Sequence, residues 1–179
     1  MAKQIRAGAW RRLERPYTRK SKYRSKAFVR AIPTNKIVKF EMGNLSKEFP
    51  YIVRLHSSTD IQIRHNALES GRKTANRALD LGIGKNSYKF LFRVYPHHIL
   101  RNNPLAAGAG ADRMSTGMKM SFGKPVGLAA QIRKGQPIME VHCNKRNIQV
   151  AKKALSRARK KFPKGGYLSV DETEITTSA

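Results

Sequence analysis

The chain has 179 residues, about the length of one domain, and its 37 lysines and arginines outnumber 11 acidic residues to give a net charge of +26. Apolar residues make up 40% of it, which is enough to bury a core and excludes a purely disordered basic tail. No run approaches the roughly 20 apolar residues of a membrane span, and the single cysteine, Cys143, excludes an internal disulfide. We therefore expect a soluble, cytoplasmic chain without a membrane partner.

A charge of this size destabilises a compact monomer through self-repulsion, so the compensating anions are expected to come from a partner. Heparin-like ligands and acidic membrane surfaces also attract such a chain, but nucleic acid is the commonest partner for this composition. The composition therefore favours nucleic-acid binding before any motif is considered.

Residues 1–35 are predicted to form a basic N-terminal arm, in which eleven lysines and arginines accompany a single acid, Glu14. The apolar residues follow no clear period, which is typical of an extended chain that places guanidinium groups on phosphates and rings on unstacked bases. A mitochondrial transit peptide is also rich in arginine and poor in acids, and it stays open as an alternative. The residues expected to contact RNA here are Arg11, Arg12, Arg15, Arg19, Lys20, Lys22 and Arg24.

The first half of the chain after the arm is predicted to contain two strands and a helix. Alternating apolar and polar residues indicate half-buried strands over 36–42 and 51–56. The residues that would share one face of the first strand are Val38, Phe40 and Met42. Thr59 and Gln62 then have the spacing of a helix-capping box, so we expect a helix over 60–81 with a stripe of small residues on its packed face.

The second half is predicted to add four strands. A nearly continuous apolar run over 88–95 indicates a central strand that a proline ends. Two further strands are expected over 126–132 and 138–143, and the residues between them, 133–137, have the composition of a tight hairpin turn. A last strand is expected over 167–170.

The clearest predicted element is a helix over 147–162. Its apolar residues step by three and four positions, which places them on one face: Ile148, Ala151, Leu155, Ala158 and Phe162. Nine lysines and arginines lie from Lys145 to Lys164 without a single acid, whereas an ordinary solvated helix face carries both signs. The basic residues of this helix that we expect to bind RNA are Lys152, Arg159 and Lys160.

Residues 100–125 form a long segment without a usable period, and structureless segments of this length tend to be functional or disordered. Its glycines allow the backbone to approach a partner closely. The charged residues that it offers a partner are Arg101, Arg113, Lys119 and Lys124. We interpret 36–170 as a single α+β domain that carries this extended loop and is followed by a flexible acidic tail over 171–179.

The sequence offers no convincing catalytic set. Adjacent His97 and His98 would point to different sides of a strand, and no second pair of ligands has the spacing of a metal site. The run from Gly117 to Lys124 superficially resembles a phosphate-binding loop, but it has five intervening residues instead of four, and Pro125 stands where a Ser or Thr is needed. No pair of carboxylates suggests acid–base chemistry. We therefore predict a protein that is not an enzyme and that needs no metal and no cofactor.

Several runs of residues resemble one protein family. The loop carries Ala-Gly-Ala-Asp-Arg-Met-Ser-Thr-Gly-Met-Lys over 109–119 and Phe-Gly-Lys-Pro-Val-Gly over 122–127. Other stretches that agree in order and spacing are 15–20, 36–43, 67–77 and 92–98. The resemblance covers about residues 11 to 170. It is to the universal large-subunit ribosomal protein family called L-sixteen in bacteria and L-ten-e in archaea and eukaryotes, in its archaeal form.

The resemblance implies an α+β fold in which two helices pack on a mixed, mostly antiparallel sheet in a hammerhead-like arrangement. It also implies that the protein binds large-subunit rRNA among neighbouring ribosomal proteins and beside the A-site tRNA. The loop would then be directed toward the peptidyl transferase centre. The residues that occupy the loop motif are Arg113, Met114, Gly117 and Lys119. Arg72 and Arg77 occupy the basic positions of the first helix.

We therefore expect a structural constituent of the large ribosomal subunit that binds rRNA and helps to shape the A-site tRNA region. Peptide-bond chemistry would belong to the RNA. The alternative is a free-standing RNA chaperone or ribosome assembly factor, and a more remote one is an RNA-modifying enzyme without a visible site.

Overall fold

The fold is given by a computed structural model that describes residues 6–18, 22–26, 29, 31–103 and 123–172. Short 3-10 turns are η1 (Ala7–Trp10), η2 (Arg24–Lys26) and η3 (Lys145–Asn147). The helices are α1 (His65–Gly82) and α3 (Ile148–Arg159). The strands are β1 (Glu41–Gly43), β2 (Tyr51–Ser57), β3 (Ile61–Arg64), β4 (Tyr88–Phe92), β5 (His98–Asn102), β6 (Lys124–Ile132), β7 (Pro137–Cys143) and β8 (Gly166–Glu172).

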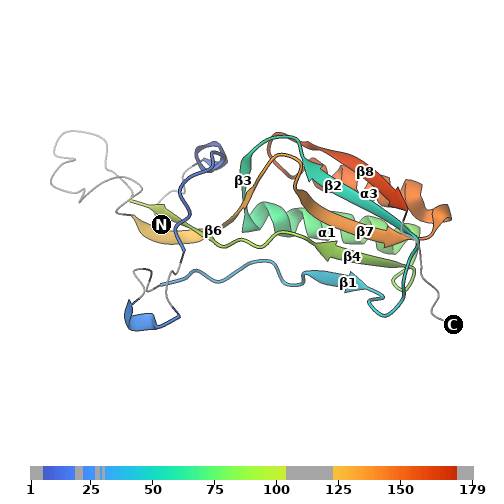
Figure 1. Ribbon diagram of the computed structural model, residues 1–179, viewed down its shortest axis with the longest axis horizontal. Coiled ribbons are helices and arrows are strands. Elements are labelled where there is room, and N and C mark those ends of the chain that lie inside the picture. Colours follow the sequence, from blue (N-terminus) through green and yellow to red (C-terminus); the bar gives the residue numbers. More distant parts are fainter. Residues whose placement is uncertain (1–5, 19–21, 27–28, 30, 104–122, 173–179) are drawn as a thin grey trace.

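The strands form two sheets, and both helices cover the same side of the larger one (Figure 1). Five strands make the larger sheet in the order β1-β4-β7-β2-β8, and three make the smaller sheet in the order β3-β6-β5. The predicted α+β class with two helices on a sheet is confirmed. The strands divide between two sheets instead of one, and every ladder among the described residues is antiparallel.

The core lies between the two helices and the larger sheet. Leu155 of α3 is fully buried, as the predicted apolar stripe requires, and Phe162 just beyond the helix is 7% exposed. The Phe162 ring lies over Gly71 of α1, where an added Cβ would stand 2.7 Å from the ring Cζ. The small residue of α1 therefore makes room for the ring. At the end of β7, burial raises the pKa of the Cys143 thiol to about 11.

The first helix begins later than the sequence pattern predicts. Residues 61–64 form β3, and α1 starts at His65, so the capping-box prediction on Thr59 and Gln62 is wrong. Gln62 instead pairs with Gln131 of β6 in the smaller sheet. A capping box is a signal between near neighbours, and here a pairing between distant strands outweighs it.

Only the end of the first predicted strand, 36–42, is a strand in the structure. Val38 is 72% exposed while the adjacent Ile37 is buried, so the predicted face of the 36–42 strand is wrong. Before β1, the backbone N–H of Val38 donates to the Glu69 carboxylate of α1 at 3.4 Å instead of to a strand. The chain therefore runs along the helix first and joins the sheet only at Glu41.

The predicted hairpin over 133–137 is also wrong. Gly135 has a φ of +81°, as a tight turn requires, but the strands on its two sides do not pair with each other. β6 pairs with β3 and β5, whereas β7 pairs with β2 and β4. The turn therefore passes the chain from one sheet to the other, which its composition cannot reveal.

Both ends of the predicted loop belong to strands. β5 runs to Asn102 and pairs with the start of β6, with Asn102 opposite Lys124. The rest of the loop, 104–122, lies outside the described residues. Similarly, Asp171 and Glu172, the first residues of the predicted tail, extend β8 beyond the predicted 167–170, and residues 173–179 lie outside the described part.

A buried carboxylate ties the strands of the larger sheet together on the side away from the helices. Arg54 of β2 donates from Nε to Glu140 Oε1 at 2.9 Å, and Arg93 donates from Nε to Oε2 at 2.6 Å. Arg54 also binds Asp171 of β8. Burial is the largest single influence on Glu140 and raises its pKa, but His142, Arg93 and Arg54 together outweigh it and lower the pKa to about 2.

Phe162→Ala is expected to lower the free energy of unfolding by about 3–5 kcal/mol, because Gly71 has no side chain with which to fill the cavity. Urea denaturation followed by circular dichroism measures the loss. Gln149→Ala, on the exposed side of α3, is the matched control and should change stability by less than about 0.5 kcal/mol. Equal losses in the two variants would show that the ring does not hold α3 to the core.

Glu140 is expected to make the protein acid-sensitive. Its pKa is about 2 in the folded protein against an ordinary value of 4.5, so its contribution to stability is complete above about pH 4.5 and is lost as the pH falls toward 2. Glu140→Gln should flatten this part of the profile and lower stability at neutral pH, since Arg93 loses its carboxylate partner and Arg54 keeps only Asp171. Urea titrations at stepped pH test this, and an unchanged acid profile in the variant would contradict it.

Candidate nucleic-acid interface

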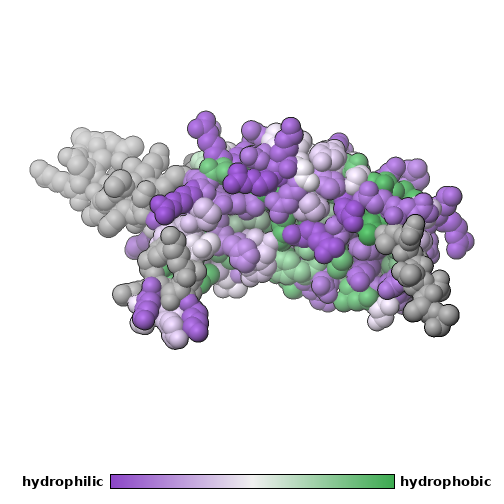
Figure 2. Space-filling view, in the orientation of Figure 1, coloured by the Kyte–Doolittle hydropathy of each residue, from purple (hydrophilic) through white to green (hydrophobic). Residues whose placement is uncertain are grey.

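Most described carboxylates are held by neighbouring side chains. Besides Glu140, the Glu69 carboxylate accepts two hydrogen bonds from Arg72, at 2.7 and 2.8 Å, and Asp60 lies 3.7 Å from Arg133. The acids therefore offset few of the outer cations. Hydrophilic side chains cover much of the visible face (Figure 2). The negative charge that would balance the exposed cations has to come from outside the chain.

The N-terminal arm is docked on the smaller sheet, which corrects the expectation of a wholly extended arm. Trp10 is 4% exposed and packs with Leu100 of β5, whereas Val29 packs with Ile99 of the same strand. Neighbouring residues of a strand point to opposite faces, so the described part of the arm contacts both faces of the sheet. In Figure 1 the arm passes across this end of the molecule.

Two glutamines of the smaller sheet fix the position of the arm. Gln62 donates its backbone N–H to the Arg11 carbonyl and its Nε2–H to the Trp10 carbonyl, each at 3.0 Å. Gln131 donates its Nε2–H to the Glu14 carbonyl at 2.8 Å. Because these bonds use the backbone of the arm, they leave its charged side chains available to a partner.

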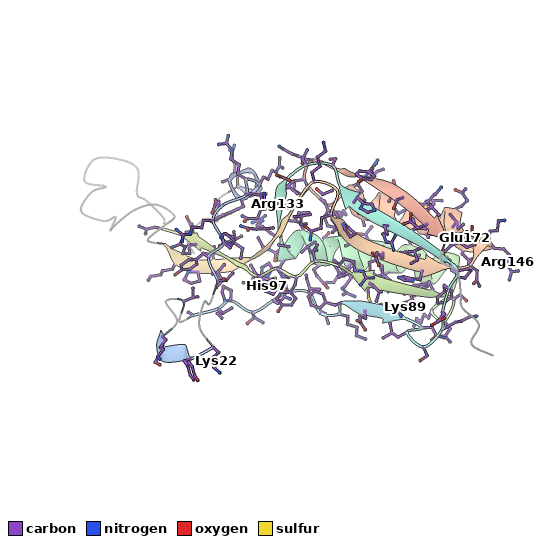
Figure 3. All side chains as sticks on the ribbon, in the orientation of Figure 1. Lys22, Lys89, His97, Arg133, Arg146 and Glu172 are labelled. Atoms are coloured by element: carbon purple, nitrogen blue, oxygen red, sulfur yellow. The ribbon has the colours of Figure 1, made fainter. Side chains whose placement is uncertain are left out.

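The predicted RNA-contacting cations of the arm keep an outward position where they are described. Those with exposed side chains are Arg11, Arg12, Arg15 and Lys22. Figure 3 shows Lys22 at the outer edge of the molecule, away from the larger sheet. Arg24 begins η2, but its side chain is not described, and Arg19 and Lys20 lie outside the described residues.

Arg101 has a role that the sequence did not predict. It lies in β5, half-buried, with its guanidinium carbon 3.6 Å from the centre of the Tyr17 ring. The Tyr17 backbone donates to His98 Nδ1 at 2.8 Å, and the Tyr17 carbonyl accepts from Ile99 at 2.9 Å. Burial lowers the pKa of His98, and the charge of Arg101 lowers it further. A lower pKa favours the neutral ring, whose Nδ1 can accept this hydrogen bond. Arg101 therefore helps to hold the arm on β5.

The two basic residues of α1 lie in different settings. The side chain of Arg72 is 12% exposed, binds Glu69 and also donates to the Met42 sulfur at 3.0 Å. The hydrogen bond with Glu69 raises the pKa of Arg72 and lowers that of Glu69. Arg77 is exposed. The structure thus makes Arg72 a residue that joins α1 to β1, and it leaves Arg77 free to meet a ligand.

α3 presents the basic face that its sequence predicts. Lys160 is exposed and Lys152 is half-exposed, and further exposed cations on this helix and just after it are Lys153, Arg157 and Lys161. Arg159 is half-exposed and donates from Nη1 to the Gly166 carbonyl at 3.2 Å, so it also fixes the start of β8. The stripe of Ala151, Leu155 and Ala158 faces the core and keeps these cations outside.

The antiparallel pair of strands β5 and β6, called the β5–β6 ribbon below, leads into the predicted tRNA-facing loop. Lys124 is exposed where β6 begins. A Cβ at the preceding Gly123 would lie against the backbone of Asn102, so glycine allows the two strands to close there. The remaining predicted loop residues lie outside the described part of the chain: Arg113, Met114, Gly117 and Lys119.

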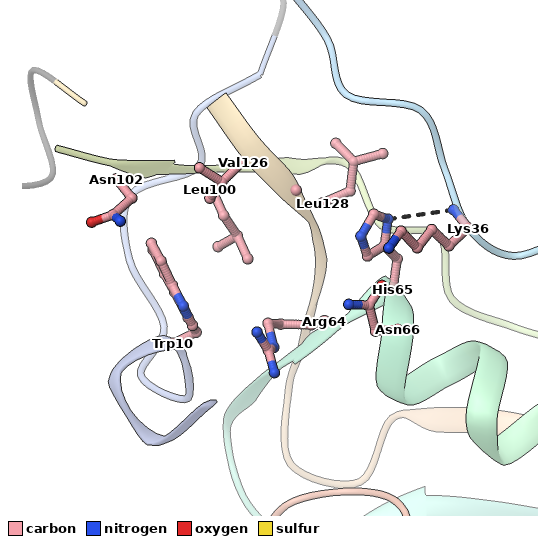
Figure 4. Close-up of a pocket in the computed structure, with 10 residues that line it drawn as sticks. Trp10, Lys36, Arg64, His65, Asn66, Leu100, Asn102, Val126 and Leu128 are labelled. Atoms are coloured by element: carbon pink, nitrogen blue, oxygen red, sulfur yellow. Dashed lines mark hydrogen bonds between the residues drawn. The ribbon is translucent and has the colours of Figure 1, made fainter. Parts of the chain in front are cut away.

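Sequence reasoning missed a basic cluster at the start of α1. Lys36 and Arg64 line a small cavity of about 50 Å³ together with Trp10 and other residues (Figure 4). The Lys36 backbone donates to His65 Nδ1 at 3.4 Å. Burial lowers the pKa of His65, and the charges of Lys36 and Arg64 lower it further. These residues come from separate segments, so no local pattern in the sequence could have grouped them.

The described residues show no sign of two other kinds of site. They hold no group of three or more His, Cys, Asp or Glu side chains placed to bind a metal ion. Among them no helix has the length and apolar character needed to cross a bilayer. The docked arm, α3, the exposed side of α1 and the β5–β6 ribbon carry the basic residues described above.

Comparison with known proteins shows the family of the chain. The family model of ribosomal protein L16p/L10e matches residues 14–165. A large ribosomal subunit protein uL16 from Methanococcus maripaludis (strain C7) is 51% identical over 146 residues, which is 82% of this chain and 84% of the relative. The protein of the same name from Archaeoglobus fulgidus is 45% identical over 157 residues, 88% of this chain and 87% of the relative. The chain therefore belongs to the ribosomal protein L16p/L10e family.

Proposed function

We propose that the protein is a structural constituent of the large ribosomal subunit in the cytoplasm and binds large-subunit rRNA beside neighbouring ribosomal proteins. The observation that carries this proposal is the separation of charge: most described acids bind partners within the chain, while the cations of the arm and α3 face outward. Contacts to phosphate would supply the missing negative charge. Family membership supports this function over a free-standing chaperone.

The residues proposed to bind rRNA are those of the arm, the exposed side of α1 and the outer face of α3. We retain Arg11, Arg12, Arg15, Lys22, Arg77, Lys152 and Lys160 as direct contacts, together with Arg19, Lys20 and Arg24. Arg159 and Arg72 each have a partner within the chain, so we assign them a second role in positioning β8 and β1. No catalytic step is assigned to any of these side chains, and the proposal is of a protein that is not an enzyme.

A finer part of the proposal concerns the loop at the end of the β5–β6 ribbon. We infer that it reaches toward the A-site tRNA and the peptidyl transferase centre, with Arg113 and Lys119 as its charged contacts. What supports this is the ribbon itself. The arm packs on both of its faces, which gives a segment carried at its end a rigid base.

Cosedimentation tests the main proposal. The chain should remain with large subunits after a high-salt wash, because a ribosomal component is held by many simultaneous contacts and by buried neighbours. A transient chaperone would be released by the same wash, since phosphate contacts alone weaken steeply with salt. Release of the chain together with loosely bound factors would contradict a structural role.

Replacing residues 105–119 with a short Gly-Ser linker tests the loop assignment. The melting temperature of the free protein should stay nearly the same, because the docked arm and the pairing of Asn102 with Lys124 hold the ribbon independently of these residues. Reconstituted subunits that carry the variant should bind A-site tRNA less well in a filter-binding assay. Subunits that assemble fully and bind A-site tRNA as tightly as the wild type would show that the loop does not serve this site.

A further inference from the structure

A groove of about 440 Å³ lies where three distant parts of the chain meet. Its lining comes from η1 and the residue after it, from the end of β3 and the first part of α1, and from the segment that follows α3, starting at Lys160. Trp10, Arg64 and Asn66 line both this groove and the small cavity of Figure 4. In the close-up, Arg64 extends into the space between Trp10 and the start of α1.

The groove gathers positive charge without compensation. Four of the residues that line it are cations and none of its described lining residues is acidic: Arg11, Arg64, Lys160 and Lys161. α1 also starts here without an acid in its first turn or a side-chain cap, so the positive end of its dipole faces the same region. Cations brought together in this way repel one another unless an anion lies between them.

A ligand with repeated negative charges fits this surface better than a single small anion. Arg11 also lines a neighbouring hollow of about 460 Å³, whose other cations are Arg12, Arg133 and Lys164 and whose one acid is Asp60. The basic surface therefore continues from one hollow into the next. A sugar–phosphate backbone carries one charge on each nucleotide and can follow such a track.

We propose that this groove holds a stretch of RNA sugar–phosphate backbone, which bridges the N-terminal arm and the end of α3. The inference rests on the proposed rRNA-binding function and adds a defined site to it, with Arg64 and Lys161 as contacts. Arg11 reaches the groove only while Trp10 is docked and Gln62 holds the Arg11 carbonyl. Binding of RNA and docking of the arm therefore stabilise each other.

The first test compares two double variants that remove the same charge. Arg64→Gln with Lys161→Gln removes groove cations, whereas Lys145→Gln with Arg146→Gln removes cations before α3, at the opposite end of that helix. Figure 3 places Arg146 at the far end of the molecule from the arm. The probe is a large-subunit rRNA fragment with a fluorescent label, titrated at several salt concentrations, and circular dichroism confirms that both variants fold.

The groove variant should bind about tenfold or more weakly, and the slope of its affinity against salt should fall by about 2, one for each lost phosphate contact. The control variant should lose less affinity. Equal losses in the two variants would overturn the groove while leaving rRNA binding intact. Absence of binding by the wild-type chain would instead overturn the proposed function, and the groove with it.

The second test uses Trp10 as a reporter, since it is the only tryptophan of the chain. Urea that releases the arm from the smaller sheet exposes Trp10 to acrylamide, and the added rRNA fragment should protect its fluorescence from quenching. The fragment should also raise the urea concentration at which half of the molecules have released the arm. The control variant should keep this shift and the groove variant should lose it. A shift of equal size in both variants, or no shift in the wild type while RNA is bound, would overturn the coupling.

Discussion

Scarcity of negative charge is the constraint on which this fold depends. With 11 acids for 37 lysines and arginines, the chain cannot neutralise itself, and it places carboxylates where a cation is already partly buried. Glu140 between Arg54 and Arg93 is the clearest case, because one carboxylate joins three segments of the larger sheet. The remaining cations repel one another across the surface, so the isolated protein carries an electrostatic strain that a polyanion relieves.

Elements that depend on near neighbours were predictable. The helix around Leu155 follows from residues spaced by three and four, and the structure keeps its boundaries to within a few residues. The failures concern partners far away in the chain. Gln62 sits in a convincing capping pattern and yet belongs to a strand, because Gln131 pairs with it from 69 positions away. The turn at Gly135 was recognised as a turn, but nothing local states that it joins two different sheets.

The composition of the proposed RNA-binding surface was predictable from the sequence, but its assembly was not. The basic arm and the basic face of α3 follow from charge counting, and the family resemblance is confirmed. The sequence did not show that Trp10 anchors the arm, because a single aromatic residue in an aperiodic segment is equally suited to stacking on a base. It also did not show that Arg72 is committed to Glu69, since an i, i+3 pair on a helix is often solvated and weak.

The burial of Cys143 makes this single-cysteine chain a convenient subject for site-specific chemistry. Thiols react as thiolates, and a thiol with a pKa of about 11 in a closed core is both protonated and inaccessible at neutral pH. The native protein should therefore not react with maleimide reagents, and Cys143 should be modified only when the larger sheet opens. A cysteine introduced on the surface would then be the only reactive position, so a fluorophore or crosslinker could be attached there without first removing the natural thiol.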